Sequence, residues 1–229
     1  LYSSLNKILT SNVKAITVED PVEYHINGVN QIQVHNDVGL TFAQGLRSIL
    51  RHDPDIIMIG EIRDLETAEA AIQASLTGHL VFSTLHTNDA CSSITRLVDM
   101  KIEPYLVASS LKAVLAQRLI RTICKKCAKF SSENNLSFSK DLDLNGIKTR
   151  FGAGCKECKH SGYLGRIGVY ELLSIDNELR RSIISSSDPI SLATSARERK
   201  LLSTLLEDGI EKIKEGITTP NEVIRAIET

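Results

Sequence analysis

A run of four apolar residues, Ile56–Ile59, is the part of the sequence that most constrains the fold. Pro54 and Asp55 precede this run, and Gly60 follows it. A short apolar run with such borders is typical of a strand that is buried on both faces, which is the pattern of a parallel sheet. Glu61 then comes at the carboxyl end of the strand, where open α/β sheets bind their ligands. The segment therefore predicts a carboxylate at the ligand-binding edge of a parallel sheet.

Helix and strand patterns alternate on both sides of this run. Residues 15–18 predict a second buried strand, and residues 31–34 alternate between polar and apolar as a half-exposed strand does. Such alternation predicts an α/β fold, in which a parallel sheet carries helices on its faces. The other predicted elements are a strand at 79–84 and helices at 1–9, 42–51 (capped by Thr41), 65–77 (capped by Asp64), 90–100 and 104–119.

The composition changes after Arg121. Residues 124–168 lack long apolar runs and contain four of the five cysteines. From Asp176 onward the pattern predicts a small helical bundle. In the last helix Thr219 is the predicted cap, Pro220 the first helical residue and Glu222 the glutamate that completes a capping box.

Length and charge limit the class of protein. A chain of 229 residues can form one sizeable core with a small appendage. The formal net charge of −1 predicts no general affinity for nucleic acid or membranes. No apolar run is long enough to cross a bilayer, and the first residues do not form a basic-then-apolar signal. We therefore expect a reducing compartment, where paired Cys-x-x-Cys motifs favour a metal over a disulfide.

Acidic residues follow two of the predicted strands. Glu19, Asp20 and Glu23 come directly after the strand at 15–18, as Glu61 comes after Ile56–Ile59. Parallel neighbouring strands would bring these carboxylates to one edge of the sheet, where a metal or a water network relieves their repulsion. Nucleotide chemistry uses such groups to hold magnesium and to polarise water. The alternative is that the first three acids only cap a turn, because Asp followed by Pro commonly opens one.

Two histidines lie at or just beyond the ends of the strand predicted at 79–84. His86 comes after its carboxyl end, where it could sense the γ-phosphate of a nucleotide or pair with Glu61. His79 begins the strand and is the weaker candidate. The alternative for His86 is a cap at the start of the next helix.

Three arginines are further candidates for contact with phosphate. Arg47 and Arg51 are spaced to share one helix face, and Arg63 follows the Glu61 strand. In a ring-shaped ATPase such arginines could reach the phosphates of a neighbouring subunit. The alternative is that they solvate an exposed face.

Two Cys-x-x-Cys motifs form the most specific pattern in the sequence. Cys124 and Cys127 form the first motif, and Cys155 and Cys158 form the second. Four thiolates with this spacing are typical of tetrahedral zinc, and four sulfur ligands leave no open position, so the predicted zinc is structural. A redox pair or a disulfide is the alternative. Cys91 has no partner motif and is expected to pack inside a helix.

Basic residues surround the cysteine motifs. A basic face beside a zinc knuckle can bind nucleic acid or anionic lipid, but Phe130 and Tyr163 are the main aromatic candidates for stacking. A solvated or protein-docking face is therefore favoured over one that binds nucleic acid. The basic residues are Arg118, Arg121, Lys129, Lys159, His160 and Arg166.

Several of these segments together resemble the ATPases of type II secretion and type IV pilus assembly. Residues 50–64 resemble the Walker B signature of that family, 17–23 its Asp box and 77–89 its His box. The resemblance also covers residues 116–119, the four paired cysteines and residues 162–173. The cysteines favour the assembly or secretion branch over the pilus-retraction branch.

The resemblance implies a fold, a domain organisation and a function. The fold would be a RecA-like P-loop NTPase core at residues 1–121, a zinc-binding subdomain at 122–170 and a C-terminal helical subdomain at 171–229. The function would be ATP hydrolysis with magnesium, in a hexameric ring that drives secretion or pilus assembly. The implied location is the cytoplasmic face of a bacterial inner membrane. The implied partners are the inner-membrane platform and the cytoplasmic-domain proteins of the machine.

One expected motif is missing from the sequence. A P-loop NTPase needs a glycine-rich loop ending in Gly-Lys-Ser/Thr at a helix start, and no such loop occurs here. In the resembled family this loop directly precedes the helix that Leu1-Tyr2 would continue. We therefore expect a piece of a longer motor that is inactive by itself. Two other classes stay open: a non-catalytic, zinc-stabilised interaction module, and a RecA-like remodeller of nucleic acid.

Overall fold

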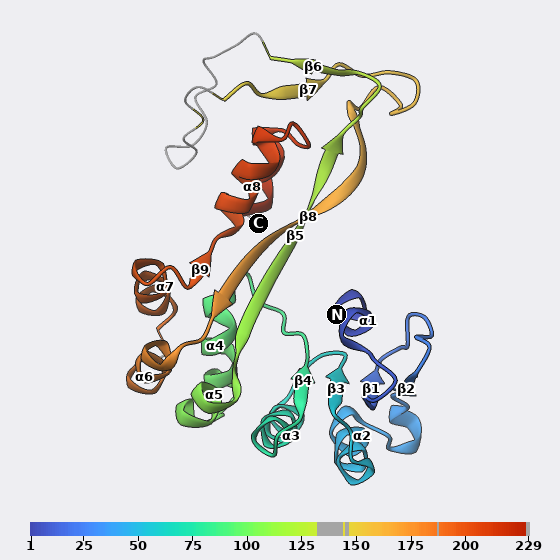
Figure 1. Ribbon diagram of the computed structural model, residues 1–229, viewed down its shortest axis with the longest axis vertical. Helices are drawn as coiled ribbons and strands as arrows, with labels where there is room; N and C mark the ends of the chain where they lie inside the picture. The colour runs from blue at the N-terminus through green and yellow to red at the C-terminus, as the bar shows by residue number, and fades with distance from the viewer. Residues whose placement is uncertain (132–143, 145–146, 187, 228–229) are drawn as a thin grey trace. The chain divides into compact units, whose positions relative to one another are not determined.

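The computed structural model describes residues 1–131, 144, 147–186 and 188–227 (Figure 1). Contacts divide the chain into two compact units. The first unit comprises Leu1–Thr87, Ser92–Lys112 and Asn177–Leu192. The second unit comprises Asn88–Cys91, Ala113–Asp176 and Ala193–Thr229.

The first unit contains the predicted parallel sheet. Its strands lie in the order β2 (Val29–Gln33), β1 (Ala15–Glu19), β3 (Ile56–Ile59) and β4 (Leu80–Phe82), and all neighbours are parallel. Every residue of β1 and β3 is buried, as the continuous apolar run predicted. The sheet order confirms the α/β class expected from the sequence.

Apolar clusters cover both faces of this sheet. On one face Ile16, Val18, Ile57 and Ile59 pack with residues of α2 (Phe42–Ile49) and α3 (Leu65–Leu76). On the other face Ala15, Ile56 and Met58 pack with Leu5 of α1 (Tyr2–Ile8). Because successive residues of a strand point to opposite faces, a strand covered on both sides favours apolar side chains at every position, as in β3, and the buried Thr17 and Glu19 of β1 are the exceptions. This explains the unbroken apolar runs.

The predicted helix caps of this unit are present. Thr41 accepts a hydrogen bond of 3.2 Å from the N–H of Gln44, and Asp64 accepts one of 2.8 Å from the N–H of Thr67. Each cap satisfies a backbone donor that the helix itself leaves unpaired. The remaining helical elements are the 3₁₀ turns η1 (Asn36–Val38) and η2 (Leu50–His52), α4 (Ala90–Asp99, which begins in the second unit), α5 (Pro104–Ser110) and α6 (Asn177–Ser185).

The second unit is built on a long antiparallel hairpin. β5 (Ala113–Ile123) pairs with β8 (Tyr163–Ser174), and β9 (Leu202–Ser203) pairs with the other edge of β8. α8 (Leu205–Lys214) and α9 (Pro220–Ile227) bury Ile213 and Val223 against Ile120 and Val169 of the hairpin. The other elements are the paired strands β6 (Ala128–Phe130) and β7 (Arg150–Gly152) and the helix α7 (Pro189–Glu198). The first residues of α7 belong to the first unit and the rest to the second.

The helix predicted over residues 104–119 is wrong in its second half. α5 ends at Ser110, and residues 113–123 form β5 instead. Alanine, leucine, glutamine and arginine favour helix locally, but pairing along the whole of β8 satisfies the backbone of this segment as a strand. Tertiary pairing therefore outweighs local propensity here.

After residue 176 the described chain is helical apart from β9, as predicted. No helix among the described residues is long and apolar enough to cross a membrane.

Candidate functional site

The carboxyl ends of β1, β3 and β4 form one edge of the sheet. Beyond the strands, the N–H of Gly60 donates to the carbonyl of Val18 at 2.8 Å, and the N–H of Ile62 donates to that of Thr84 at 3.0 Å. The segments carrying Glu19, Glu61 and His86 therefore continue side by side at this edge. In the sheet order β2-β1-β3-β4, the chain leaves β1 toward β2 on one side and leaves β3 toward β4 on the other side. The strand order therefore reverses between β1 and β3, and open α/β sheets bind their ligands at such a reversal.

Glu61 lies at the centre of this edge between the side chains of Arg63 and His86. One carboxylate oxygen forms an ion pair with Arg63, and the other lies 3.1 Å from Nε2 of His86. The side chain of Glu61 is 13 % exposed, whereas that of His86 is 84 % exposed. Burial acts to raise the pKa of Glu61, but the hydrogen bonds from Arg63 and His86 outweigh it and lower that pKa. Glu61 is therefore an ionised carboxylate at neutral pH, and its histidine partner faces solvent.

Glu19 is the last residue of β1 and is almost fully buried, with 3 % of its surface exposed. One carboxylate oxygen accepts hydrogen bonds from the hydroxyl of Thr17 and, at 3.0 Å, from Nε2 of Gln31. The other oxygen accepts a hydrogen bond from the hydroxyl of Tyr2. The structure thus holds Glu19 by three protein donors.

Sequence reasoning missed these three partners of Glu19. Thr17 and Gln31 are paired in the register of β1 and β2, and Thr17 faces the same side of the strand as Glu19. The parallel pairing of the two strands was the signal that could have identified Thr17 and Gln31. Tyr2 lies one helical turn from the buried Leu5, so the helical periodicity could have placed Tyr2 on the sheet side of α1.

The other acidic and basic candidates lie in different places. Asp20 and Glu23 are exposed in the turn after β1. The pKa of Arg63 is raised chiefly by Glu61 and further by the charge of Asp20, so Asp20 belongs to the electrostatic surroundings of this edge. Arg47 forms an ion pair of 2.8 Å with Glu66 across exposed positions of α2 and α3.

Two more candidates make local contacts with helix ends. A guanidinium nitrogen of Arg51 donates to the carbonyl of Arg47 at 3.1 Å, which completes the end of α2. Nδ1 of His79 lies 2.9 Å from the carbonyl of Ala74 at the end of α3. His79 precedes β4 and so lies at its amino end, opposite to the edge that carries Glu61.

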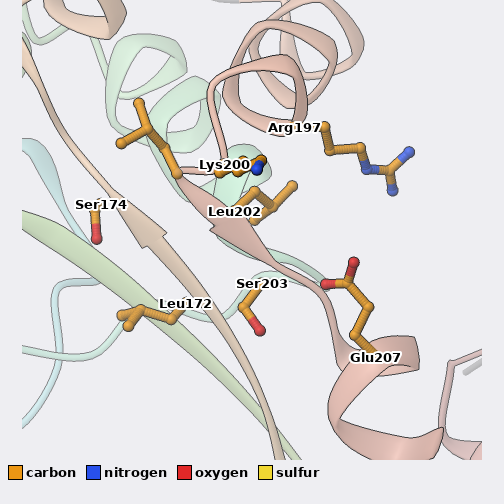
Figure 2. Close-up of a pocket in the computed structure, with 8 residues that line it drawn as sticks. Leu172, Ser174, Arg197, Lys200, Leu202, Ser203 and Glu207 are labelled. Atoms are coloured by element: carbon orange, nitrogen blue, oxygen red, sulfur yellow. The ribbon is translucent and has the colours of Figure 1, made fainter.

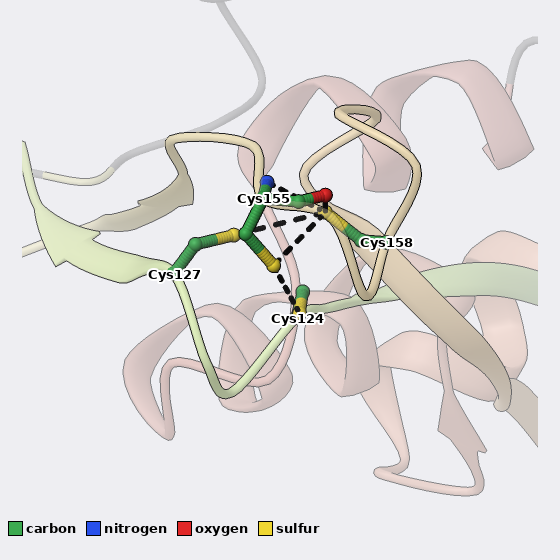
Figure 3. A group of neighbouring side chains, drawn as sticks. All are labelled: Cys124, Cys127, Cys155 and Cys158. Atoms are coloured by element: carbon green, nitrogen blue, oxygen red, sulfur yellow. Dashed lines mark hydrogen bonds between the residues drawn. The ribbon is translucent and has the colours of Figure 1, made fainter.

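Four sulfur atoms meet in the second unit (Figure 3). Sγ of Cys124 lies 3.9 Å from that of Cys155, Sγ of Cys127 lies 3.9 Å from that of Cys158, and the sulfurs of Cys155 and Cys158 are 3.7 Å apart. A tetrahedral zinc with Zn–S distances of about 2.3 Å separates its sulfurs by roughly 3.8 Å. The donor set and its dimensions therefore fit zinc, and all five cysteines are free of disulfides.

Backbone donors favour the thiolate form of one of these cysteines, Cys158. The N–H groups of Cys155 and Gly162 point at Sγ of Cys158 from 3.2 and 3.3 Å. Burial opposes ionisation of Cys158, but these two hydrogen bonds, together with those from the thiols of Cys155 and Cys127, lower the pKa of its thiol to about 6. The fold needs glycine here, because a Cβ at Gly152 would lie 2.0 Å from the carbonyl oxygen of Gly162.

Cys91 and the open cavity of the second unit show no comparable chemistry. Burial, helped by Asp89 and Glu171, raises the pKa of the Cys91 thiol to about 12, which matches the packed cysteine predicted for this position. A cavity of about 430 Å³ lies beside β9 and is lined by Ser174, Arg197, Lys200 and other residues (Figure 2). None of the candidate site residues lines this cavity.

Comparison with solved structures defines the class. The fold is similar to the pilus retraction motor PilT with bound ADP, with a TM-score of 0.71 and 29% identity over 98% of this chain and 56% of that one. It is also similar to the ATPase DotB of Legionella pneumophila, with a TM-score of 0.66 and 25% identity over 95% of this chain and 52% of that one. The parallel-sheet α/β fold of this chain is thus the fold of the PilT and DotB ATPases.

The chain belongs to the family of type II/IV secretion system proteins, whose model (T2SSE) matches residues 1–225. It is 48% identical to type II secretion system protein E of Aeromonas hydrophila over 98% of this chain and 45% of that protein. It is 47% identical to the type IV pilus assembly ATPase PilB of Thermus thermophilus over 99% of this chain and 26% of that protein. The chain therefore spans less than half the length of these relatives.

Proposed function

We propose that this chain is the catalytic part of an ATPase that powers type II secretion or type IV pilus assembly. The observation that carries the proposal is the ionised Glu61, held by Arg63 and His86 at the carboxyl edge of a parallel sheet. Relatives with 47% and 48% identity are a pilus assembly ATPase and a type II secretion protein E, which supports this reading of the edge. The same identities support the RecA-like description of the first unit.

Glu61 would act on the water that attacks the γ-phosphate, or on the magnesium ion that accompanies ATP. Its lowered pKa keeps it charged, and the salt bridge to Arg63 fixes its orientation. His86 is exposed and bound to the same carboxylate, so a phosphate that approaches this edge meets His86 first. His86 can then report the state of the γ-phosphate by keeping or breaking its contact with Glu61.

The acids beside Glu61 would shape the surroundings of the metal. Asp20 and Glu23 are exposed in the turn after β1, where oxygen ligands or bound waters could face magnesium. Glu19 adds a fixed negative charge beside them, because its neighbours hold it at the end of β1. Arg47, Arg51 and His79 make contacts within the first unit, and their action on nucleotide remains a prediction from the sequence.

ATP hydrolysis by the complete product of the gene that encodes this chain tests the proposal. Glu61→Gln keeps the size of the side chain but removes its charge, so we expect turnover to fall at least 100-fold. Glu66→Gln is the matched control, because Glu66 is exposed and pairs only with Arg47 among the described residues. Undiminished hydrolysis in Glu61→Gln would refute the proposed role of this edge.

The second unit would contribute a structural zinc held by Cys124, Cys127, Cys155 and Cys158, which supplies a rigid cross-link. We also propose the three-part division expected from the sequence, with boundaries at residues 121/122 and 170/171. The assembly would be a hexameric ring at the cytoplasmic face of the inner membrane. Its partners would be the membrane platform and cytoplasmic-domain proteins of the machine. Nucleic acid is not a proposed partner.

Two results would favour the other classes. A complete gene product that binds partner proteins but hydrolyses no ATP would be the interaction module. Salt-sensitive binding of single-stranded nucleic acid, with ATP turnover that depends on it, would indicate the remodeller.

A further inference from the structure

The hydroxyl of Tyr2 lies among three polar groups at the edge described above. It contacts the Glu19 carboxylate, the N–H of Glu23 at 3.2 Å and Nε2 of Gln31 at 3.4 Å. The last two groups are donors and cannot accept a proton. The proton of the Tyr2 hydroxyl therefore points to Glu19, and its oxygen accepts a hydrogen bond from the N–H of Glu23, with the amide nitrogen of Gln31 as a more distant neighbour. This hydroxyl thus joins helix α1 to the end of β1 and to the acidic turn that follows it.

The amide of Gln31 fixes the direction of this network. Its oxygen accepts a hydrogen bond of 2.8 Å from the N–H of Ile26, so its nitrogen must face Glu19 and Tyr2. The same nitrogen also lies 3.2 Å from the carbonyl of Tyr24. Because the backbone of the turn sets the orientation of the amide, Gln31 can only act as a donor to Glu19.

The ring of Tyr2 is held separately from its hydroxyl. It packs against the apolar cluster that contains Leu5 and Met58 and meets the ring of Tyr24 edge-on, with 4.6 Å between the ring centroids. Removing the hydroxyl alone should therefore leave these apolar contacts in place. It would leave one oxygen of Glu19 and the N–H of Glu23 without this partner.

We propose that Tyr2 is a positioning residue for ATP hydrolysis, which fixes the Glu19 carboxylate through its hydroxyl. This inference rests on the proposed function, because the hydrolysis of ATP is what the positioned carboxylate serves. Three donors hold Glu19 in a single orientation beside Gly60, whose own position would bring a Cβ to 3.4 Å from Cα of Glu19. Without the hydroxyl of Tyr2, one oxygen of that carboxylate loses its hydrogen bond, and only the bonds from Thr17 and Gln31 to the other oxygen resist rotation of the group.

The test compares Tyr2→Phe with Tyr24→Phe in the complete gene product. We expect Tyr2→Phe to lower kcat for ATP about tenfold and to change KM less than twofold, because Glu19 loses its orientation while ATP still binds. Tyr24→Phe is the matched control, because the hydroxyl of Tyr24 has no hydrogen-bond partner among the described residues. Both constants should stay within twofold of the unmodified protein. Circular dichroism checks that both variants are folded.

A double-mutant cycle separates positioning from a general structural effect. If Tyr2 acts through Glu19, adding Tyr2→Phe to Glu19→Gln should lower kcat less than twofold further. Crystal structures of Tyr2→Phe and Tyr24→Phe give a measurement that does not depend on hydrolysis. The Glu19 carboxylate should change orientation in Tyr2→Phe and keep it in Tyr24→Phe.

Three outcomes would overturn the inference. They are unchanged kcat in Tyr2→Phe, a full tenfold loss that persists in the Glu19→Gln background, and an unmoved Glu19 carboxylate in the Tyr2→Phe crystal. The proposed function fails separately, if the unmodified protein does not hydrolyse ATP or if Glu61→Gln leaves hydrolysis intact. In that case the orientation of Glu19 in the crystals alone decides whether Tyr2 positions it.

Discussion

Glu61 in the first unit and Glu222 in the second unit are both carboxylates held by two basic side chains, but their surroundings differ. Glu61 is bound by Arg63 and His86, and those partners are 64 % and 84 % exposed. The side chain of Glu222 is only 3 % exposed, and it is bound by Arg121 and Arg225. It also accepts a hydrogen bond of 3.0 Å from the N–H of Arg121.

The difference shows what each pair can do. The exposed partners of Glu61 can exchange it for a ligand, because water and phosphate can reach them. Glu222 ties α9 to β5 through a side chain and a backbone group together, and no ligand can reach its oxygens without separating the two. The cysteine cluster resembles Glu222 in this respect, because four sulfurs leave a bound zinc no position for substrate. We therefore expect chemistry in the first unit and cross-linking in the second.

Loss of zinc should have the largest effect on this contrast. Structural zinc binding contributes about 10 kcal/mol or more to the folding of small zinc domains. We expect Cys155→Ala to abolish zinc binding and to expose the amides of residues 124–130 and 150–163 to hydrogen exchange. The sheet of the first unit should keep its protection. Metal analysis and hydrogen exchange with mass spectrometry measure both effects.

Cys91→Ala serves as the matched control for this change. Cys91 is buried like Cys124 and Cys158, but it lies outside the cluster. The Cys91→Ala protein should bind one zinc ion per chain. A reduced, freshly purified protein without zinc would show that the four thiols serve redox chemistry or a disulfide instead.

Glu222→Gln should have the next largest effect, a loss of about 2–3 kcal/mol in the free energy of unfolding. The change leaves the charge of Arg121 without its buried partner, and such losses are large for buried pairs. Urea unfolding followed by circular dichroism measures it, with Glu66→Gln as the exposed control. ATP turnover per folded molecule should stay unchanged, in contrast to Glu61→Gln. If Glu222→Gln and the unmodified protein were equally stable, Glu222 would not be a stabilising link between α9 and β5.

The stabilisation by Glu222 should also depend on pH. Burial acts to raise the pKa of Glu222, but its bonds to Arg121 and Arg225 lower that pKa from 4.5 to about 2. Because the folded-state pKa is depressed, the contribution is complete above pH 4.5 and is lost as the pH falls toward 2. The difference in stability between the unmodified protein and Glu222→Gln should therefore vanish between about pH 5 and pH 2. A constant difference across this range would contradict the assignment.

The residues that the sequence predicted best are those with local signals. The apolar run Ile56–Ile59, the cap at Asp64 and the paired cysteines each depend on a few neighbouring residues, and all three are present as predicted. Walker B-like and His-box-like segments were also correctly expected at one sheet edge, because parallel strands end together.

What the sequence could not show depends on partners far along the chain. Thr219 caps α9 as predicted, because its hydroxyl accepts a hydrogen bond of 3.4 Å from the N–H of Glu222. The expected return bond from the Glu222 carboxylate was wrong, because that carboxylate binds Arg121 of β5 instead. Residues 113–119 of β5 were expected to be helical for the same reason, since the partner strand β8 lies beyond the cysteine motifs. The bond between Tyr2 and Glu19 also joins two different elements. Local patterns contain no information about such pairings.

The smallest effect is expected for the ion pair between Arg47 and Glu66, and it tests whether exposure alone predicts function. The two side chains are 57 % and 56 % exposed, so solvent screens the pair and Arg47→Ala should cost less than about 0.5 kcal/mol in stability. If the side chain of Arg47 is only a hydrated surface group on α2, ATP turnover of the complete gene product with Arg47→Ala should stay within twofold of the unmodified protein. If Arg47 instead reaches the phosphates of a neighbouring subunit, turnover should fall at least tenfold with stability unchanged. That result would show that an exposed cation can serve catalysis outside the sheet edge. The contrast between the ligand-accessible Glu61 and the structural Glu222 would then have to take contacts between subunits into account.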